Sequence, residues 1–175
     1  MKLKAPFPLG AGMFVIVFIG NCGQSLDPIT TEGLVDAPID KVWAAWTTND
    51  GLQSWLAPSA EIDLKIGGLM VTGKNTQGGL GEPQTTENRI MAFEDGKMLA
   101  LRIVKTPNDF PYPKRAKQMW TVINLEERGP DKTQVRIVGM RFETDKKSLE
   151  MRAYFIGENS RTLERLQKHF ASEQS

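Results

Sequence analysis

The stretch of sequence that decides the fold opens with APIDKVWAAWT (37–47), continues with GLQSWL (51–56) and closes with IGG (66–68). Pro38 suits the first turn of a helix, because a proline there gives up no hydrogen bond. Apolar side chains follow at helical spacing, namely Ile39, Val42, Trp43 and Trp46. Asn-Asp-Gly ends this helix, and Asp50 is placed to cap a second one. The stretch therefore predicts two short helices in succession.

Strands and one long helix surround this stretch. Strand-forming runs bounded by turn residues lie at 29–35, 61–66, 69–72, 88–93, 98–104, 119–125 and 133–142. Residues 106–117 carry three prolines and predict a loop. Residues 145–171 predict an amphipathic helix whose apolar face carries Ile156, Asn159, Leu163, Leu166 and Phe170. The order predicts an α+β fold, in which a curved antiparallel sheet wraps around the long C-terminal helix and two short helices follow the first strand.

The first 23 residues predict an export signal rather than part of the fold. Lys2 and Lys4 precede an apolar run of about a dozen residues, which is shorter than the roughly 20 that a membrane-spanning helix needs. Cys22 leaves two interpretations open. In the first, Cys22 is the lipidated cysteine of a lipobox (IGNC, 19–22), in which asparagine replaces the usual small residue. In the second, the signal is cleaved and the protein is soluble. Both place the domain outside the cytoplasm, either periplasmic or secreted, with a lipid anchor as its only tie to the membrane.

The remaining chain divides into a tether at 24–28 and one domain at 29–172. The whole chain has 22 basic and 21 acidic residues, and losing the two leader lysines leaves a slightly acidic domain. That balance argues against a nucleic-acid partner. One histidine, His169, and one cysteine exclude a multi-histidine or Cys-cluster metal site and an internal disulfide. We therefore expect no metal and no cofactor.

The opening stretch, together with TQVRI (133–137) and the helix from Gly157 to Phe170, resembles the SRPBCC (START-like) superfamily. Within it, the chain is most similar to the branch named after the activator of heat-shock-protein-90 ATPase. The resemblance implies a helix-grip fold with a deep, mostly apolar cavity between sheet and helix. Members bind lipids, sterols, polyketides or hormones, and a few are cyclases or dehydratases. The branch name implies co-chaperone activity for a few members, and a secretory leader would separate this chain from that cytosolic chaperone.

Candidate ligand contacts combine apolar walls with a few polar groups. They are Trp55, Met70, Met91, Arg102, Met119, Trp120, Tyr154, Phe155 and Asn159. Core packing is the competing interpretation for the methionines, a packing hinge for Trp55, and a solvated surface position for Arg102. Asn159 interrupts the apolar stripe, so it either faces the cavity or lies at a kink near Gly157. Phe110 and Tyr112, on the Pro-rich loop, are candidates for a lid.

Three functions follow from these residues. The first is an exported binding protein that holds a hydrophobic or amphipathic small molecule between sheet and helix. The second is an enzyme of the cyclase or hydrolase type, which requires at least two of Asn159, Tyr154 and Arg102 to converge in the cavity. The third is a protein-interaction module for a cell-envelope partner. No acid–base pair or nucleophile motif is recognisable, so we expect no catalytic residues.

Overall fold

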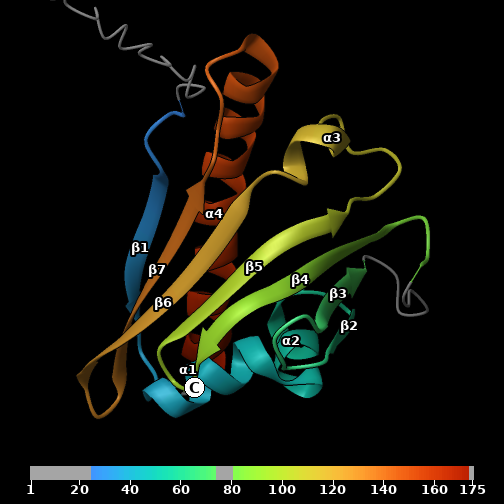
Figure 1. Ribbon diagram of the computed structural model, residues 1–175. Coiled ribbons are helices and arrows are strands. Elements are labelled where there is room, and N and C mark those ends of the chain that lie inside the picture. Colours follow the sequence, from blue (N-terminus) through green and yellow to red (C-terminus); the bar gives the residue numbers. More distant parts are fainter. Residues whose placement is uncertain (1–24, 74–80, 174–175) are drawn as a thin grey trace, which may run out of the picture.

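The computed structural model describes residues 25–73 and 81–173. Its elements in chain order are β1 (Ile29–Val35), α1 (Ile39–Thr47), α2 (Asn49–Trp55), β2 (Ser59–Ile62), β3 (Leu69–Gly73), β4 (Thr85–Glu94), β5 (Met98–Lys105), α3 (Pro113–Ala116), β6 (Trp120–Gly129), β7 (Lys132–Met140) and α4 (Lys146–Glu173). The strands form one antiparallel sheet in the order β1-β7-β6-β5-β4-β3-β2. The long helix α4 lies along one face of this sheet, and α1 and α2 close one end (Figure 1). The predicted α+β helix-grip architecture is confirmed.

The corner between α1 and α2 depends on a close backbone approach. The Thr48 hydroxyl accepts a hydrogen bond from the Gly51 amide at 3.0 Å, so Thr48 caps α2 and the prediction of Asp50 as the cap is wrong. A Cβ at Gly51 would lie 2.2 Å from the carbonyl oxygen of Ala44. Only glycine therefore allows the two helices to follow each other so directly.

The predicted strand 61–66 is shorter in the structure than its alternating pattern indicated. The strand β2 ends at Ile62, and residues 63–68 form a turn in which the Gly68 amide donates to the carbonyl of Lys65 at 2.9 Å. Ile66 is consequently 74% exposed. Glycine at position 67 has a φ of 84°, which permits the turn and stops the strand.

The Pro-rich segment, defined here as residues 106–112, leads into a short helix that the sequence pattern did not predict. Pro113 occupies the first turn of α3, where its missing amide hydrogen costs nothing. Arg115 of α3 forms ion pairs with Glu143 at 2.6 Å and Asp145 at 2.7 Å. These bonds fix α3 beside the start of α4, and one side of the Pro-rich segment is thereby held in place.

Buried residues along α4 follow the predicted stripe with one exception. Ile156 is 44% exposed, because the inward face runs through Met151, Phe155 and Asn159 instead. The helix is continuous through Gly157. Asn159 is 9% exposed and lies between apolar residues on both sides along the stripe.

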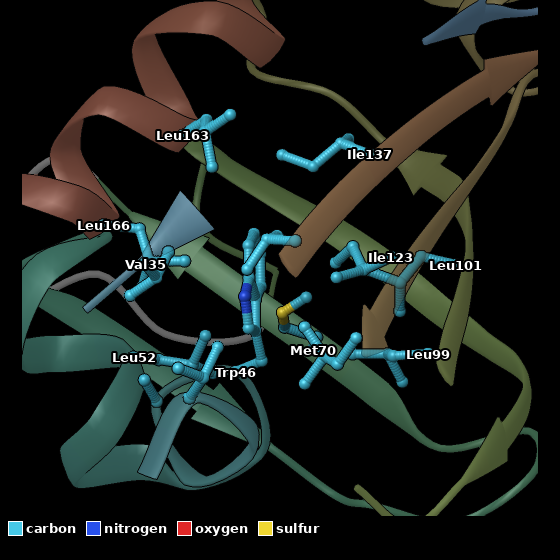
Figure 2. Packing of buried hydrophobic residues seen from close by; sticks show 14 of the residues in the cluster. Val35, Trp46, Leu52, Met70, Leu99, Leu101, Ile123, Ile137, Leu163 and Leu166 are labelled. Atoms are coloured by element: carbon cyan, nitrogen blue, oxygen red, sulfur yellow. The ribbon is translucent and has the colours of Figure 1, made fainter. Parts of the chain in front are cut away.

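The core consists of two apolar clusters along α4. The larger one surrounds Trp46, which lies among Leu163 and Leu166 of the helix and Met70 and Ile123 of the sheet (Figure 2). The smaller cluster contains Ile29, Ile103, Ala116, Met119, Phe142 and Met151. Asn159, at the middle of the helix, belongs to neither cluster. Asn159 is thus a buried polar residue on the same helix that carries members of both clusters.

Candidate functional site

A hollow of about 500 Å³ lies between the sheet and α4, and it is open to solvent on one side. Its walls include members of both apolar clusters, since Ile123 comes from the larger and Ile103 from the smaller. The α2–β2 connection contributes Leu56, Ala57 and Pro58. We call this space the main chamber.

The sheet wall of the main chamber is divided into a polar and an apolar part. Thr72 of β3 and Thr86 of β4 are cross-strand partners, and the adjacent pair is Met70 and Asn88. The opposite part, on β5, β6 and β7, consists of Leu101, Ile103, Ile123 and Ile137 with Thr121. Polar side chains thus predominate on β3 and β4 and apolar ones on β5, β6 and β7, with Asn88 across from Ile103 and Thr121 across from Leu101.

The helix wall continues this division. Asn159 and Thr162 lie on the chamber side of α4 beside Phe155, and Glu158 and Arg165 stand at its margin. Arg165 donates a long hydrogen bond of 3.4 Å to the carbonyl of Leu56. Glu158 forms an ion pair with Arg161.

Four uncharged polar side chains of the chamber make no hydrogen bond within the described residues. Among the residues that the structure describes, no side-chain hydrogen bond is found for Asn159, Asn88, Thr86 or Thr162. By contrast, the buried Thr133 hydroxyl outside the chamber donates to the carbonyl of Ala37 at 2.8 Å. Since buried polar groups in proteins are normally paired, the partner of Asn159 must be water or a bound molecule.

A smaller compartment of about 340 Å³ adjoins the main chamber beneath the Pro-rich segment. The two spaces share lining residues, among them Ile103, Phe155, Asn159 and Thr162. Phe110 and Pro111 of the Pro-rich segment and Tyr154 of α4 border only this second space. We call it the aromatic compartment.

The pKa of the Tyr154 phenol depends on burial and on the charges around the aromatic compartment. Partial burial, followed by the negative charge of Glu158, raises its pKa above the ordinary value, and Asp109 acts in the same direction. Arg161 opposes them. Burial is therefore the main cause of the raised pKa, and the two carboxylates add to it.

Five of the predicted contact and lid residues border these spaces. Met70, Phe155 and Asn159 line the main chamber. Phe110 and Tyr154 line the aromatic compartment, together with Phe155 and Asn159. Two of the three polar groups named for an enzyme, Tyr154 and Asn159, thus meet in one space, and the third, Arg102, does not.

Three predicted contacts lie elsewhere because of strand direction or local packing. The Arg102 side chain is exposed and donates through Nε to the carbonyl of Lys117 at 2.9 Å. Trp120 is the cross-strand partner of Arg102 and lines neither space. Trp55 packs on Trp46, with ring centroids 4.7 Å apart, and donates to the carbonyl of Ala45. It joins the two short helices rather than facing the chamber.

The remaining predicted residues also lie outside the two spaces. Met119 is buried in the smaller apolar cluster, and Tyr112 packs against that cluster. Met91 lies at a register irregularity of β4 and borders neither space. Cys22, the proposed lipidation site, lies outside the described residues.

Sequence reasoning missed the polar wall of Thr72, Thr86 and Asn88, and also the lining residues Thr121 and Thr162. The available signal was alternation: Thr86, Asn88 and Ile90 follow one another on one face of β4. Two polar residues next to a fully buried isoleucine on the same face indicate a chamber rather than a packed core.

No group of His, Cys, Asp and Glu residues within 25–73 and 81–173 is arranged to hold a metal ion. Over the same residues, no helix is both long and apolar enough to span a bilayer. The arrangement offers hydrogen-bonding groups beside apolar surface, which is suited to holding a molecule.

Comparison with known proteins identifies the relatives of this fold. The model of the family "Activator of Hsp90 ATPase homolog 1-like protein" matches residues 36–171. No curated protein matches the chain significantly. The Aha1 dimer from Colwellia psychrerythraea superposes with a TM-score of 0.62 at 16% identity, covering 83% of this chain and 96% of that one.

Two further solved structures show the same architecture. The protein XoxI from Bacillus cereus has a TM-score of 0.62 at 20% identity, with 86% of this chain and 99% of that one covered. The AHSA1-like protein from Aeromonas hydrophila has a TM-score of 0.58 at 15% identity, covering 85% and 94%. Identities this low establish the fold alone. The family match over most of the chain shows that this protein belongs to the activator of Hsp90 ATPase homolog 1-like family, within the SRPBCC superfamily.

Proposed function

We propose that this protein binds one amphipathic small molecule in the main chamber. The observation that carries the proposal is the divided wall, in which Thr72, Thr86 and Asn88 face one part of the space and Leu101 and Ile123 another. The volume of about 500 Å³ is typical of small-molecule sites. A ligand with a polar edge and an apolar body matches both parts.

The energetics of an unliganded chamber favour such a ligand. By their share of liquid volume, roughly 15 water molecules would fill the space. Waters beside Leu101, Ile123 and Ile137 lack hydrogen-bond partners on that side, so an apolar group gains free energy by displacing them. Oxygen or nitrogen atoms of the ligand would replace the waters that Asn159 and Asn88 bind. Displacement of water and hydrogen bonding therefore favour the same orientation, with the apolar part of the ligand at the apolar side chains and its polar atoms at the asparagines.

Native mass spectrometry of protein purified without detergent tests the proposal. We expect one small molecule per chain, or uptake of one equivalent of the neutral amphipathic probe N-phenyl-1-naphthylamine. Bare protein that takes up no probe would contradict it.

We further propose that this binding takes place outside the cytoplasm. The support is the leader pattern of residues 1–23, with its two lysines, its apolar run and Cys22. Fractionation of cells that express the full chain, with wild-type Cys22 and with Cys22→Ser, tests it. We expect the wild-type chain outside the cytoplasm in a processed form. Membrane association that is lost in the variant would assign the lipoprotein form, and full-length protein in the cytosol would contradict export.

A further inference from the structure

Three aromatic rings border the aromatic compartment: Phe110, Tyr154 and Phe155. The Phe110 and Tyr154 ring centroids are 5.5 Å apart with planes at 77°, and those of Tyr154 and Phe155 are 5.4 Å apart at 89°. Rings that meet at nearly right angles pack edge to face. They line this space together with Pro107 and Pro111, and of the three aromatic rings only Phe155 also lines the main chamber.

Charge in this compartment has one sign. Asp109 and Glu158 are the charged residues that line it, and no Lys, Arg or His among the described residues does so. Glu158 is ion-paired with Arg161, which leaves it partly compensated. No ion pair of Asp109 is found in the described parts of the chain, and this exposed residue precedes Phe110 in the Pro-rich segment. The raised pKa of Tyr154, caused in part by both carboxylates, agrees with the negative potential expected there.

Aromatic walls beside carboxylates suit an organic cation. The face of an aromatic ring is negative and attracts a cation, with a gain of about 0.5–1 kcal/mol at exposed sites and about 2 kcal/mol or more when the pair is desolvated. An ammonium group with alkyl substituents is weakly hydrated compared with a metal ion, so it enters an apolar space at lower cost. An anion would meet the carboxylates, and a neutral group would make no use of them.

We propose that the aromatic compartment receives the ammonium group of an amphipathic amine or quaternary ammonium ligand, whose apolar part lies in the main chamber along Leu101 and Ile123. The two spaces share Ile103, Phe155 and Thr162, so one molecule can extend through both. This inference rests on the proposed function and specifies its ligand class.

Displacement of N-phenyl-1-naphthylamine from the full chain by three compounds with the same ten-carbon tail tests the inference. The compounds are decyltrimethylammonium, 1-decanol and decanoate, compared below their micelle concentrations at constant ionic strength. We expect decyltrimethylammonium to displace the probe at an about tenfold lower concentration than decanol, with decanoate the weakest. Equal displacement by all three, or a preference for decanol or decanoate, would overturn the inference and leave the proposed function standing. Displacement by none, with no probe bound, would overturn both.

Two variants test whether the preference for the ammonium compound arises in the aromatic compartment. Asp109→Asn removes the unpaired charge, and Phe110→Leu removes a ring while keeping apolar volume. We expect each to reduce the ammonium-to-decanol ratio about threefold to tenfold, with decanol displacement unchanged. Matched controls are Asp131→Asn, in the exposed β6–β7 turn, and Phe93→Leu, which lies outside both spaces. A ratio that falls equally in the controls would contradict the placement, and the wild-type comparison stands whether or not a variant folds.

Discussion

At the scale of single residues, Asn159 and Thr133 are both buried polar residues, but only the Thr133 side chain has a hydrogen-bond partner among the residues described. Thr133 is fully buried, and its hydroxyl satisfies the carbonyl of Ala37. Asn159 faces the chamber, without a hydrogen bond among the residues described. The first contributes to stability through its partner, whereas the second is available to a ligand.

This difference predicts that removing the two polar groups changes the free energy of unfolding by unequal amounts. Thr133→Val leaves the Ala37 carbonyl buried without its partner, so we expect a loss of about 1–3 kcal/mol in the free energy of unfolding. Asn159→Leu keeps the volume and breaks no internal bond, so we expect a change below about 0.5 kcal/mol together with weaker binding of polar ligands. Urea denaturation measures both. A loss above about 1 kcal/mol in Asn159→Leu would show that the amide has a structural partner.

Arg141, directly after β7, has a φ of 71°, in the left-handed region that a residue with a Cβ rarely adopts. Glycine has no such restriction, so we expect Arg141→Gly to raise stability by about 0.5–1 kcal/mol, after allowing for the greater entropy of the unfolded glycine chain. Thermal melting measures the change. Arg136→Gly, in the middle of β7, is the control and should be destabilising. Destabilisation by both would contradict the argument.

Tyr154 adds a titration at the residue scale. The chain has two tyrosines, so Tyr112→Phe isolates the Tyr154 phenol for measurement by absorbance near 295 nm. Its pKa is raised in the folded state, so the neutral phenol contributes stability that is present below the unfolded pKa and is lost as the pH rises through the folded value. We expect titration above the pKa of an unfolded tyrosine, and a lowered pKa when tetramethylammonium is bound. An ordinary pKa would contradict the combined effect of burial and the neighbouring carboxylates.

At the scale of elements, the α1–α2 corner and the uninterrupted helix α4 use glycine differently. A Cβ at Gly51 would lie 2.2 Å from a backbone oxygen, whereas a Cβ at Gly157 would meet only the end of Arg161 at 3.4 Å. Helix propensity favours alanine by about 1 kcal/mol at both positions. We therefore expect Gly51→Ala to cost about 2 kcal/mol or more and Gly157→Ala to stabilise by up to about 1 kcal/mol. Chemical denaturation measures the free energy of unfolding of each variant. Stabilisation by both substitutions would contradict the close backbone approach at Gly51.

The elements themselves were largely predictable from sequence because their periods are local properties. The exceptions have physical reasons. Residues 63–66 continue the alternation of β2, but hydrogen bonds around Gly67 and Gly68 turn the chain, and alternation does not encode those bonds. The helix α3 has only four residues, too few to show a period.

The candidate site was less predictable, for a reason that applies to every strand. Alternation separates two faces but does not say which one meets the helix. Arg102 was therefore considered as a chamber residue although it is exposed, and the polar wall of Thr72, Thr86 and Asn88 was overlooked. Asn159 was predictable because it is the one polar residue in an otherwise apolar helical stripe. Both spaces also depend on where the Pro-rich segment lies, which is a tertiary property.

At the scale of the whole molecule, α4 contributes residues to two apolar clusters, and the main chamber lies between this helix and the sheet. The polar side chains of the chamber line that space and supply its hydrogen-bonding groups. Binding would therefore add stability, as expected for any ligand that binds only the folded chain.

The most direct test of the chamber as the binding site is a fluorescence titration of N-phenyl-1-naphthylamine into two variants of α4. Thr162 lines both spaces, so Thr162→Trp places a large ring in them, whereas Glu164→Trp places the same ring on the exposed side of the same helix. We predict saturable one-to-one binding to the wild type and to Glu164→Trp, and affinity about tenfold weaker or worse in Thr162→Trp. Equal binding by both variants, or no saturable binding by the wild type, would contradict the account.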